Sequence, residues 1–127
     1  MTVPLQLRDV WDEFWAAPRL ATLGTVRADG TPHLVPVRAI LDGDELLVLT
    51  RAASVKARNV VRRPWAAVSE LTPTTWCTVE GKAVVSEDAD DLARGRAAYE
   101  RRFGRDGWTG ADCVVLVRIE RVLGGGR

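Results

Sequence analysis

The stretch LATLGTVRADGTPHLVPVRAIL (residues 20–41) contains two β-rich runs on either side of an Asp29-Gly30 pair. Two such runs around Asp-Gly are typical of a β-hairpin, because glycine readily adopts the positive φ that tight turns require. Pro32 and Pro36 fall in the second run, which we interpret as one strand from Thr31 to Leu41. Proline has no N–H to donate to a neighbouring strand, so this strand is expected at a sheet edge or with a bulge.

Four further runs have the composition of strands, and most are joined by short turns. They are residues 45–50, 65–71, 75–86 and 113–123. No alternation of strand and helix typical of a parallel sheet is present. The pattern predicts a mainly β (α+β) fold, a six-stranded antiparallel barrel with about three flanking helices. The glycine-rich tail, residues 124–127, is expected to be disordered.

Three segments have helical features. Apolar residues in residues 9–18 recur with the spacing of one buried helical stripe, with Asp9 as a cap and Pro18 at the end. A second helix is expected between Ser54 and Pro64. A third is expected from Asp88 to about residue 103, although a glycine in its interior costs about 1 kcal/mol relative to alanine.

Length and composition predict one domain, residues 1–127, because 127 residues that are 46% hydrophobic can build one core. No apolar run approaches the ~20 residues of a membrane span, and the N-terminus lacks the layout of a signal peptide. We therefore expect a cytoplasmic protein with no membrane partner. Cys77 and Cys113 lie in strand-like runs and are interpreted as core residues. Without a Cys/His cluster, no metal site is expected.

The segment between Glu45 and Glu70 contains no acidic residue, in a chain whose formal net charge is +1. Its cations are Arg51, Lys56, Arg58, Arg62 and Arg63. Free N–H groups behind a Ser54 cap, with Lys56 and Arg58 beside them, form a candidate anion site. The alternative is a solvated basic face, and the local sequence leaves both open. Arg62 and Arg63 come late in the helix, where they complement its C-terminal dipole.

The residues themselves offer no catalytic motif. The single histidine, His33, lies in the edge strand with no serine or cysteine at motif spacing, and a lone histidine is more often structural or exposed. The carboxylates fall in turns and helix starts, where capping explains them. Neither GxGxxG nor GxxxxGK[ST] is present. An enzyme of this kind needs a cofactor to supply its chemistry.

Residues 20–37 resemble the first hairpin of the pyridoxamine 5'-phosphate oxidase-like split β-barrel flavoproteins. Residues 54–59, 76–83 and 119–124 look most like the actinobacterial branch that uses the deazaflavin coenzyme F420, in particular its biliverdin-reductase-like members. The resemblance covers roughly residues 9 to 124. It implies a split β-barrel and a homodimer with cofactor sites at the subunit interface.

The resemblance also implies roles for particular residues. Thr50 and the Ser54-Val55-Lys56 segment would hold the phosphate of the cofactor, and the strand from Pro32 to Arg38 would lie against its ring system. Trp76 is either a core aromatic or a cover for the ring from the partner subunit. The candidate cofactor-binding residues are His33, Val35, Pro36, Val37, Thr50, Ser54, Val55, Lys56, Arg58, Asn59 and Trp76.

The function implied is hydride transfer from reduced F420 to a conjugated or tetrapyrrole-like (biliverdin-type) small-molecule acceptor. The alternative within the fold is an FMN-binding oxidoreductase. A cofactor-free or haem-binding relative is a further reading, and a non-enzymatic anion or nucleic-acid binding module is an alternative of another class. Near-zero net charge argues against nucleic acid.

Three features depart from the resemblance. Many relatives carry arginine at the position of Ser54, and Val35-Pro36 replaces a polar pair. The longer C-terminal region of true pyridoxamine-phosphate oxidases is also absent, which argues against that activity. No proton donor is evident, and Arg38 and Lys82 are the candidates for a catalytic role.

Overall fold

The computed structural model describes residues 5–104 and 110–126, with side chains from residue 11 onward. Its helices are α1 (Leu5–Ala16), α2 (Val55–Arg62) and α3 (Ala89–Phe103). Its strands are β1 (Ala21–Val26), β2 (Pro32–Val37), β3 (Ile40–Asp42), β4 (Glu45–Thr50), β5 (Trp65–Leu71), β6 (Thr75–Ser86) and β7 (Cys113–Gly126). None of these helices has the length and apolar character that a membrane crossing requires.

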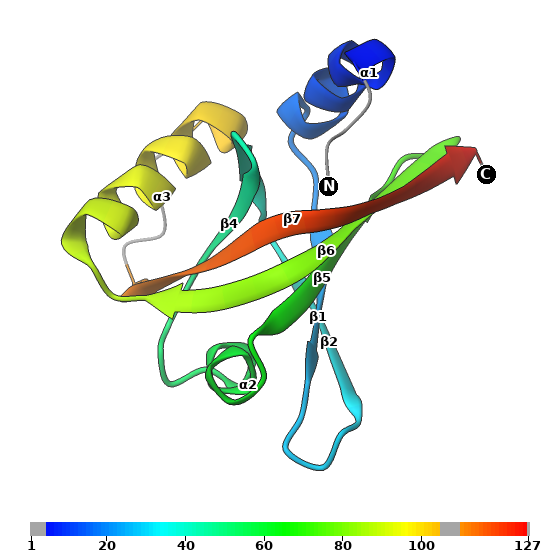
Figure 1. The fold of residues 1–127 in the computed structure, drawn as a ribbon. Helices are drawn as coiled ribbons and strands as arrows, with labels where there is room; N and C mark the ends of the chain where they lie inside the picture. Colours follow the sequence, from blue (N-terminus) through cyan, green and yellow to red (C-terminus); the bar gives the residue numbers. More distant parts are fainter. Residues whose placement is uncertain (1–4, 105–109, 127) are drawn as a thin grey trace.

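The described strands form one antiparallel sheet in the order β2-β1-β5-β6-β7-β4-β3. Figure 1 shows α2 at one end of this sheet, with α1 and α3 toward the other end. The predicted class, a mainly antiparallel split barrel with three helices, is confirmed. The predicted number of six strands is wrong, because the described residues contain seven.

The extra strand comes from the run between residues 31 and 41, which is two strands. β2 lies at one edge of the sheet and β3 at the other, and only Arg38 and Ala39 join them. So short a connection spans at most about 10 Å, so the sheet must curl until its two edges lie near each other. No ladder pairs β2 with β3 among the described residues, which makes the barrel split. The edge position that the prolines predicted for β2 is confirmed.

Two apolar clusters hold the sheet in this shape. Alternate residues of the strands fill the barrel interior, together with Trp15 of α1 and Val60 of α2. The second cluster lies outside the barrel, where α3 covers β3, β4 and β7. A Cβ at Gly95 of α3 would lie 2.9 Å from Cδ2 of Leu49. The glycine that weakened the helix prediction therefore allows α3 to approach β4 closely.

The β6–β7 ladder contains a bulge and extends further than predicted. Glu80 pairs with Arg121 but Gly81 pairs with Ile119, so Glu120 is the extra residue. β7 continues through Gly124, Gly125 and Gly126, which pair with residues 75–77 of β6. The prediction that this tail is disordered is wrong for these three glycines, because a neighbouring strand supplies their hydrogen bonds. Residue 127 lies outside the described residues.

A buried ion pair joins four parts of the chain. Arg102 of α3 donates from Nη2 to Glu70 Oε1 at 2.6 Å and from Nη1 to Oε2 at 2.8 Å. It also donates to the carbonyl of Ala17 before β1 and to that of Ala39 between β2 and β3. Arg19 lies 3.4 Å from the same carboxylate. Burial raises the pKa of Glu70, and the two guanidinium groups oppose that rise. The sequence analysis did not single out this pair.

Because of the bulge, a substitution of Gly81 tests the register of the β6–β7 ladder. A Cβ at this position would lie 1.9 Å from the carbonyl oxygen of Arg118, which is backbone and cannot rotate away. We expect Gly81→Ala to lower the free energy of unfolding by roughly 3 kcal/mol in urea denaturation. Gly126→Ala is the matched control, since its Cβ would meet nothing closer than 3.8 Å. Equal stability of the two variants would contradict the bulge.

The ion pair predicts a strong coupling between Arg102 and Glu70. Arg102→Met leaves a buried carboxylate without its partner, which should cost about 3–5 kcal/mol of unfolding free energy. The double variant Arg102→Met/Glu70→Met should recover most of that loss, because neither charge is then buried alone. Arg94→Met removes the half-exposed pairs with Asp42 and Glu45 and should cost only about 1 kcal/mol or less. A double variant no more stable than the single one would argue against the pair.

Candidate functional site

The start of α2 is the place where the basic stretch predicted an anion site. β4 ends at the buried Thr50, and Ser54 caps the helix by accepting the N–H of Ala57 at 3.3 Å. Thr50 Oγ1 also donates to Ser54 Oγ at 3.4 Å. The Ser54 hydroxyl accepts both bonds, so its own hydrogen is available to a ligand. The N–H groups of Val55 and Lys56 have no intrahelical partner, as in any first turn.

The cations around this helix start differ in exposure. Lys56 is half-buried, whereas Arg58 is exposed. Val55 is also exposed, beside them in the first turn. A half-buried lysine in the first turn of a helix, where the N–H groups are free, is a good partner for an anion, since water screens its charge less than that of a fully exposed lysine. Arg58, two residues after Lys56, points to a different side of the helix, from which it adds positive charge near the helix start.

Asn59 ties the helix to the barrel. Its side chain is 3% exposed and donates from Nδ2 to Thr25 Oγ1 of β1 at 3.1 Å. Its Oδ1 accepts from Arg62 at 3.2 Å. Both ends of the amide are therefore used within the protein. Asn59 acts as a positioning residue that fixes where Lys56 and Ser54 stand relative to β1.

His33 brings β2 to the same place. It lies opposite Thr25 in the β1–β2 ladder, and Thr25 is the residue whose hydroxyl accepts from Asn59. Its ring is half-buried, and its Nδ1 is a buried atom with no hydrogen-bond partner among the residues that the structure describes. The pKa of His33 is lowered, chiefly by burial and further by the positive charges of Arg27 and Lys56. The structure therefore brings His33 and Lys56 within electrostatic reach of each other.

The rest of β2 alternates between the two faces of the sheet. Val37 is buried, and Val35 packs against the barrel interior. Pro36 is exposed on the opposite face, as is Leu34, whose side chain is 66% exposed. A ring lying against the outer face of this strand would therefore meet Leu34 and Pro36, while Val35 and Val37 support it from within.

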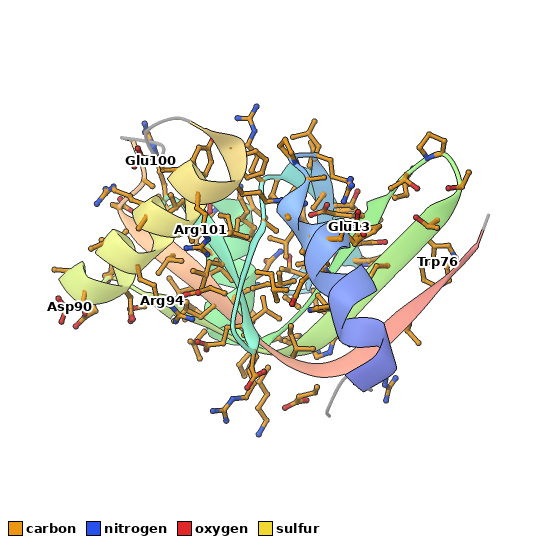
Figure 2. All side chains as sticks on the ribbon, turned by 90° about the horizontal axis from the view of Figure 1, so that it is seen from above. Glu13, Trp76, Asp90, Arg94, Glu100 and Arg101 are labelled. Carbon is orange, nitrogen blue, oxygen red and sulfur yellow. The ribbon has the colours of Figure 1, made fainter. Side chains whose placement is uncertain are left out.

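Trp76 lies far from the start of α2 within one chain. It is half-buried on β6, and its indole packs over Gly125 of β7. α2 is joined to the other end of the β5–β6 pair, where the carbonyl of Pro64 accepts from the Ala83 N–H. Trp76 is about seven residues along β6 from that end, roughly 20 Å at ~3.3 Å per residue. Figure 2 shows it beside the C-terminal end of β7.

The two candidates for a catalytic role lie apart from the helix start. Arg38 donates to the hydroxyl of Tyr99 at 3.0 Å and lies 5.6 Å from the ring centre of Phe103, so it packs against α3. Lys82 is exposed on β6, between Trp65 and Arg118 on the adjacent strands. Neither residue touches Ser54 or Lys56 in the described contacts.

A cavity of about 230 Å³ lies at the opposite end of the molecule, between α1, β3 and α3. Its lining consists of Asp12, Trp15, Ala16, Ile40, Leu41, Arg101 and Arg102. The guanidinium of Arg102 is already occupied by Glu70 and two carbonyls. Arg102 therefore has no free donor, and the other arginine of the lining, Arg101, is largely exposed and lies 3.7 Å from Asp42, so we take the start of α2 as the better candidate for an anion.

The fold and the candidate site define a split-barrel protein with a basic helix start beside β1. The pattern of the pyridoxamine 5'-phosphate oxidase family matches residues 7–124, and the chain belongs to this family. It is 34% identical over 113 residues to the F420H(2)-dependent biliverdin reductase of Mycobacterium tuberculosis (strain CDC 1551 / Oshkosh), covering 87% of this chain and 82% of that protein.

Solved structures share the fold at lower identity. The conserved hypothetical protein Rv2991 from Mycobacterium tuberculosis is 22% identical, with a TM-score of 0.79 over 99% of this chain and 86% of that one. The heme storage protein HutZ from Vibrio cholerae is 18% identical, with a TM-score of 0.73 over 92% and 93%. Proteins described in such different terms share this barrel, so the fold alone does not decide the ligand.

Thr25, whose hydroxyl connects β1 to Asn59, was not predicted as a site residue from the sequence. The available signal was a polar residue at an inward-facing position, between the apolar Leu23 and the turn. The structural role of Glu70 and Arg102 was not predicted either, because they lie in segments interpreted only as a strand and a helix. A charged residue that alternates with Ala66 and Val68 on the inner face of β5 was the signal for Glu70.

The environment of His33 predicts a pH dependence of stability. Because its folded pKa lies below the ordinary value of 6.5, the unfolded chain takes up a proton at a higher pH than the folded protein. The contribution of His33 to the free energy of unfolding is therefore fully present above about pH 6.5, and it is lost as the pH falls through the lowered folded pKa. Urea denaturation from pH 7.5 to 5 should show this loss, and His33→Gln should show less of it. An identical pH profile in both proteins would contradict the assignment.

Proposed function

We propose that this chain is an F420-dependent oxidoreductase that transfers a hydride from reduced deazaflavin to a conjugated or tetrapyrrole-like acceptor of the biliverdin type. The observation that carries the proposal is the 34% identity, over 87% of the chain, to a protein named as an F420H(2)-dependent biliverdin reductase. The site geometry supports it, because a phosphorylated cofactor needs an anion site next to a surface that can receive its ring.

The residues present fit such a cofactor. The helix start offers two N–H groups, the Ser54 hydroxyl and the half-buried Lys56, all suited to phosphate oxygens. No described strand pairs with β2 on its outer side, so its backbone and the exposed Leu34 and Pro36 can receive a flat ring. No carboxylate lies between residues 45 and 70 to repel the anion.

The bound deazaflavin would supply the hydride, and the protein would supply position and charge. Lys56 and Ser54 would hold the phosphate, with Thr50 orienting Ser54 and Asn59 orienting the helix. Arg58 would attract the acidic tail of the deazaflavin from the exposed face of the helix. β2 would hold the ring so that a flat acceptor can stack close to it, since hydride transfer requires the reacting atoms to be held close together.

We further propose a homodimer with two cofactor sites at its interface. The outer face of β1, β2 and β5 and their flanks carries exposed Leu20, Leu34 and Leu71, an apolar surface that a second copy would cover. Trp76 lies at the opposite end of β6 from the end that meets α2, so it would reach the cofactor bound by another subunit. Residues 1–127 would act as one cofactor-binding domain, since all described strands join one sheet.

FMN is the alternative cofactor. It carries the phosphate that the start of α2 is suited to hold, and the chain belongs to the pyridoxamine 5'-phosphate oxidase family. Titration of the purified protein with reduced F420 and with FMN, side by side, separates the two. We expect saturable binding of the deazaflavin and weaker binding of FMN. Purification of the protein with a tightly bound yellow flavin would favour FMN instead.

A substitution in the candidate anion site is the most direct test of where the cofactor phosphate binds. Lys56→Ala removes one charged hydrogen bond and should weaken F420 binding by about 1.5–3 kcal/mol, roughly 10- to 150-fold, with little change in stability. Arg63→Ala is the matched control, because Arg63 is an exposed cation at the far end of the same helix. It should change the affinity less than threefold. Unchanged affinity of Lys56→Ala would place the phosphate elsewhere.

A further inference from the structure

The imidazole of His33 has one nitrogen inside the protein and one outside. Nδ1 is buried and has no hydrogen-bond partner in the described part of the chain. The ring as a whole is only half-buried, so Nε2 is the nitrogen that reaches the surface. In either neutral tautomer Nε2 can bond to water, so the two differ at Nδ1, where a buried unpaired N–H is less well tolerated than a buried unpaired acceptor. The environment therefore favours the neutral tautomer that carries its proton on Nε2.

The charges around the ring keep it neutral. Arg27, in the turn after β1, donates to the carbonyl of Pro32, the residue before His33. Lys56 contributes a second positive charge from α2. The carboxylate in the same turn, Asp29, accepts from the backbone N–H and the hydroxyl of Thr31 and is engaged there. Two cations and a buried, unpaired Nδ1 all oppose a second proton on His33.

We propose that His33 is a specificity-determining residue, a neutral donor whose Nε2–H binds an acceptor oxygen of the ligand held at Lys56. The inference rests on the proposed function, because it assumes that an anionic ligand occupies the start of α2. A fixed neutral N–H selects an oxygen lone pair and gives nothing to a group that can only donate. Lys56 would then attract the ligand by its charge, and His33 would orient it through a directional hydrogen bond.

Two kinds of oxygen have this chemistry, a phosphate oxygen and a carbonyl oxygen on the ring. His33 alternates with Leu34 and Pro36 along β2, so its side chain lies on the side of Thr25 and α2 and not on the outer face where we propose that the ring lies, which favours the phosphate oxygen. Binding of reduced F420 and of inorganic phosphate alone distinguishes the two sources. A His33 variant that weakens both identifies the phosphate oxygen, and one that weakens only F420 binding identifies the ring oxygen.

Three substitutions separate the donor from the shape of the ring. His33→Gln places an amide N–H about where Nε2 lies, His33→Asn places its amide about where Nδ1 lies, and His33→Phe keeps a ring without a donor. We expect the phenylalanine and asparagine variants to weaken F420 binding about 3- to 10-fold, the range for one neutral hydrogen bond. The glutamine variant should stay within about twofold of the wild type. Full affinity in the phenylalanine variant would overturn the proposal.

A second measurement needs no variant. His33 is the single histidine, so its ring nitrogens can be followed without ambiguity by NMR of nitrogen-15-labelled protein. We expect one neutral tautomer with the proton on Nε2 at neutral pH, both free and with F420 bound. A proton on Nδ1, or a cationic ring in the complex, would overturn the proposal. If Lys56→Ala weakens binding and His33→Phe does not, only this inference fails. If neither does, the proposed site is itself wrong.

Discussion

The bidentate contact between Arg102 and Glu70 is the constraint on which the rest of the structure depends. A charge pair buried this deeply adds little net stability compared with apolar side chains, because both ions lose their hydration. Its effect is to specify geometry. The guanidinium also binds the carbonyls of Ala17 and Ala39, so α3, β5, the entry to β1 and the link between β2 and β3 are fixed relative to one another.

That geometry leads directly to the candidate site. Fixing Ala39 sets where β2 ends and β3 begins, and the short link between them curls the sheet. The β1–β2 hairpin then approaches α2, where Thr25 and Asn59 hydrogen-bond at 3.1 Å. His33 lies opposite Thr25, and Lys56 stands one turn before Asn59. A structural pair at one end of the barrel thus supports, through ordinary backbone connections, the candidate anion site at the other.

Much of the fold could be predicted from sequence where the signal was local. The Asp29-Gly30 turn, the Ser54 cap, the stop at Pro64 and the edge strand with its prolines each depend on the chemistry of a few neighbouring residues. The break at Arg38-Ala39 could not be predicted, because Val37 and Ile40 on either side both favour strands. Contacts made by Arg102, more than sixty residues later, decide it. Gly124 to Gly126 were misjudged for a similar reason, since a glycine run becomes a strand only when a partner is available.

The candidate site was predictable in part for the same reason. Ser54 and Lys56 were found from a helix cap and a charge pattern, whereas the closeness of His33 to them is a product of the sheet. The most direct test of the account is a crystal structure of the protein with F420 bound. The account predicts the phosphate against Ser54 and Lys56 at the start of α2, with the ring along β2 and Trp76 contributed by the second subunit. A phosphate bound away from Lys56 would contradict it.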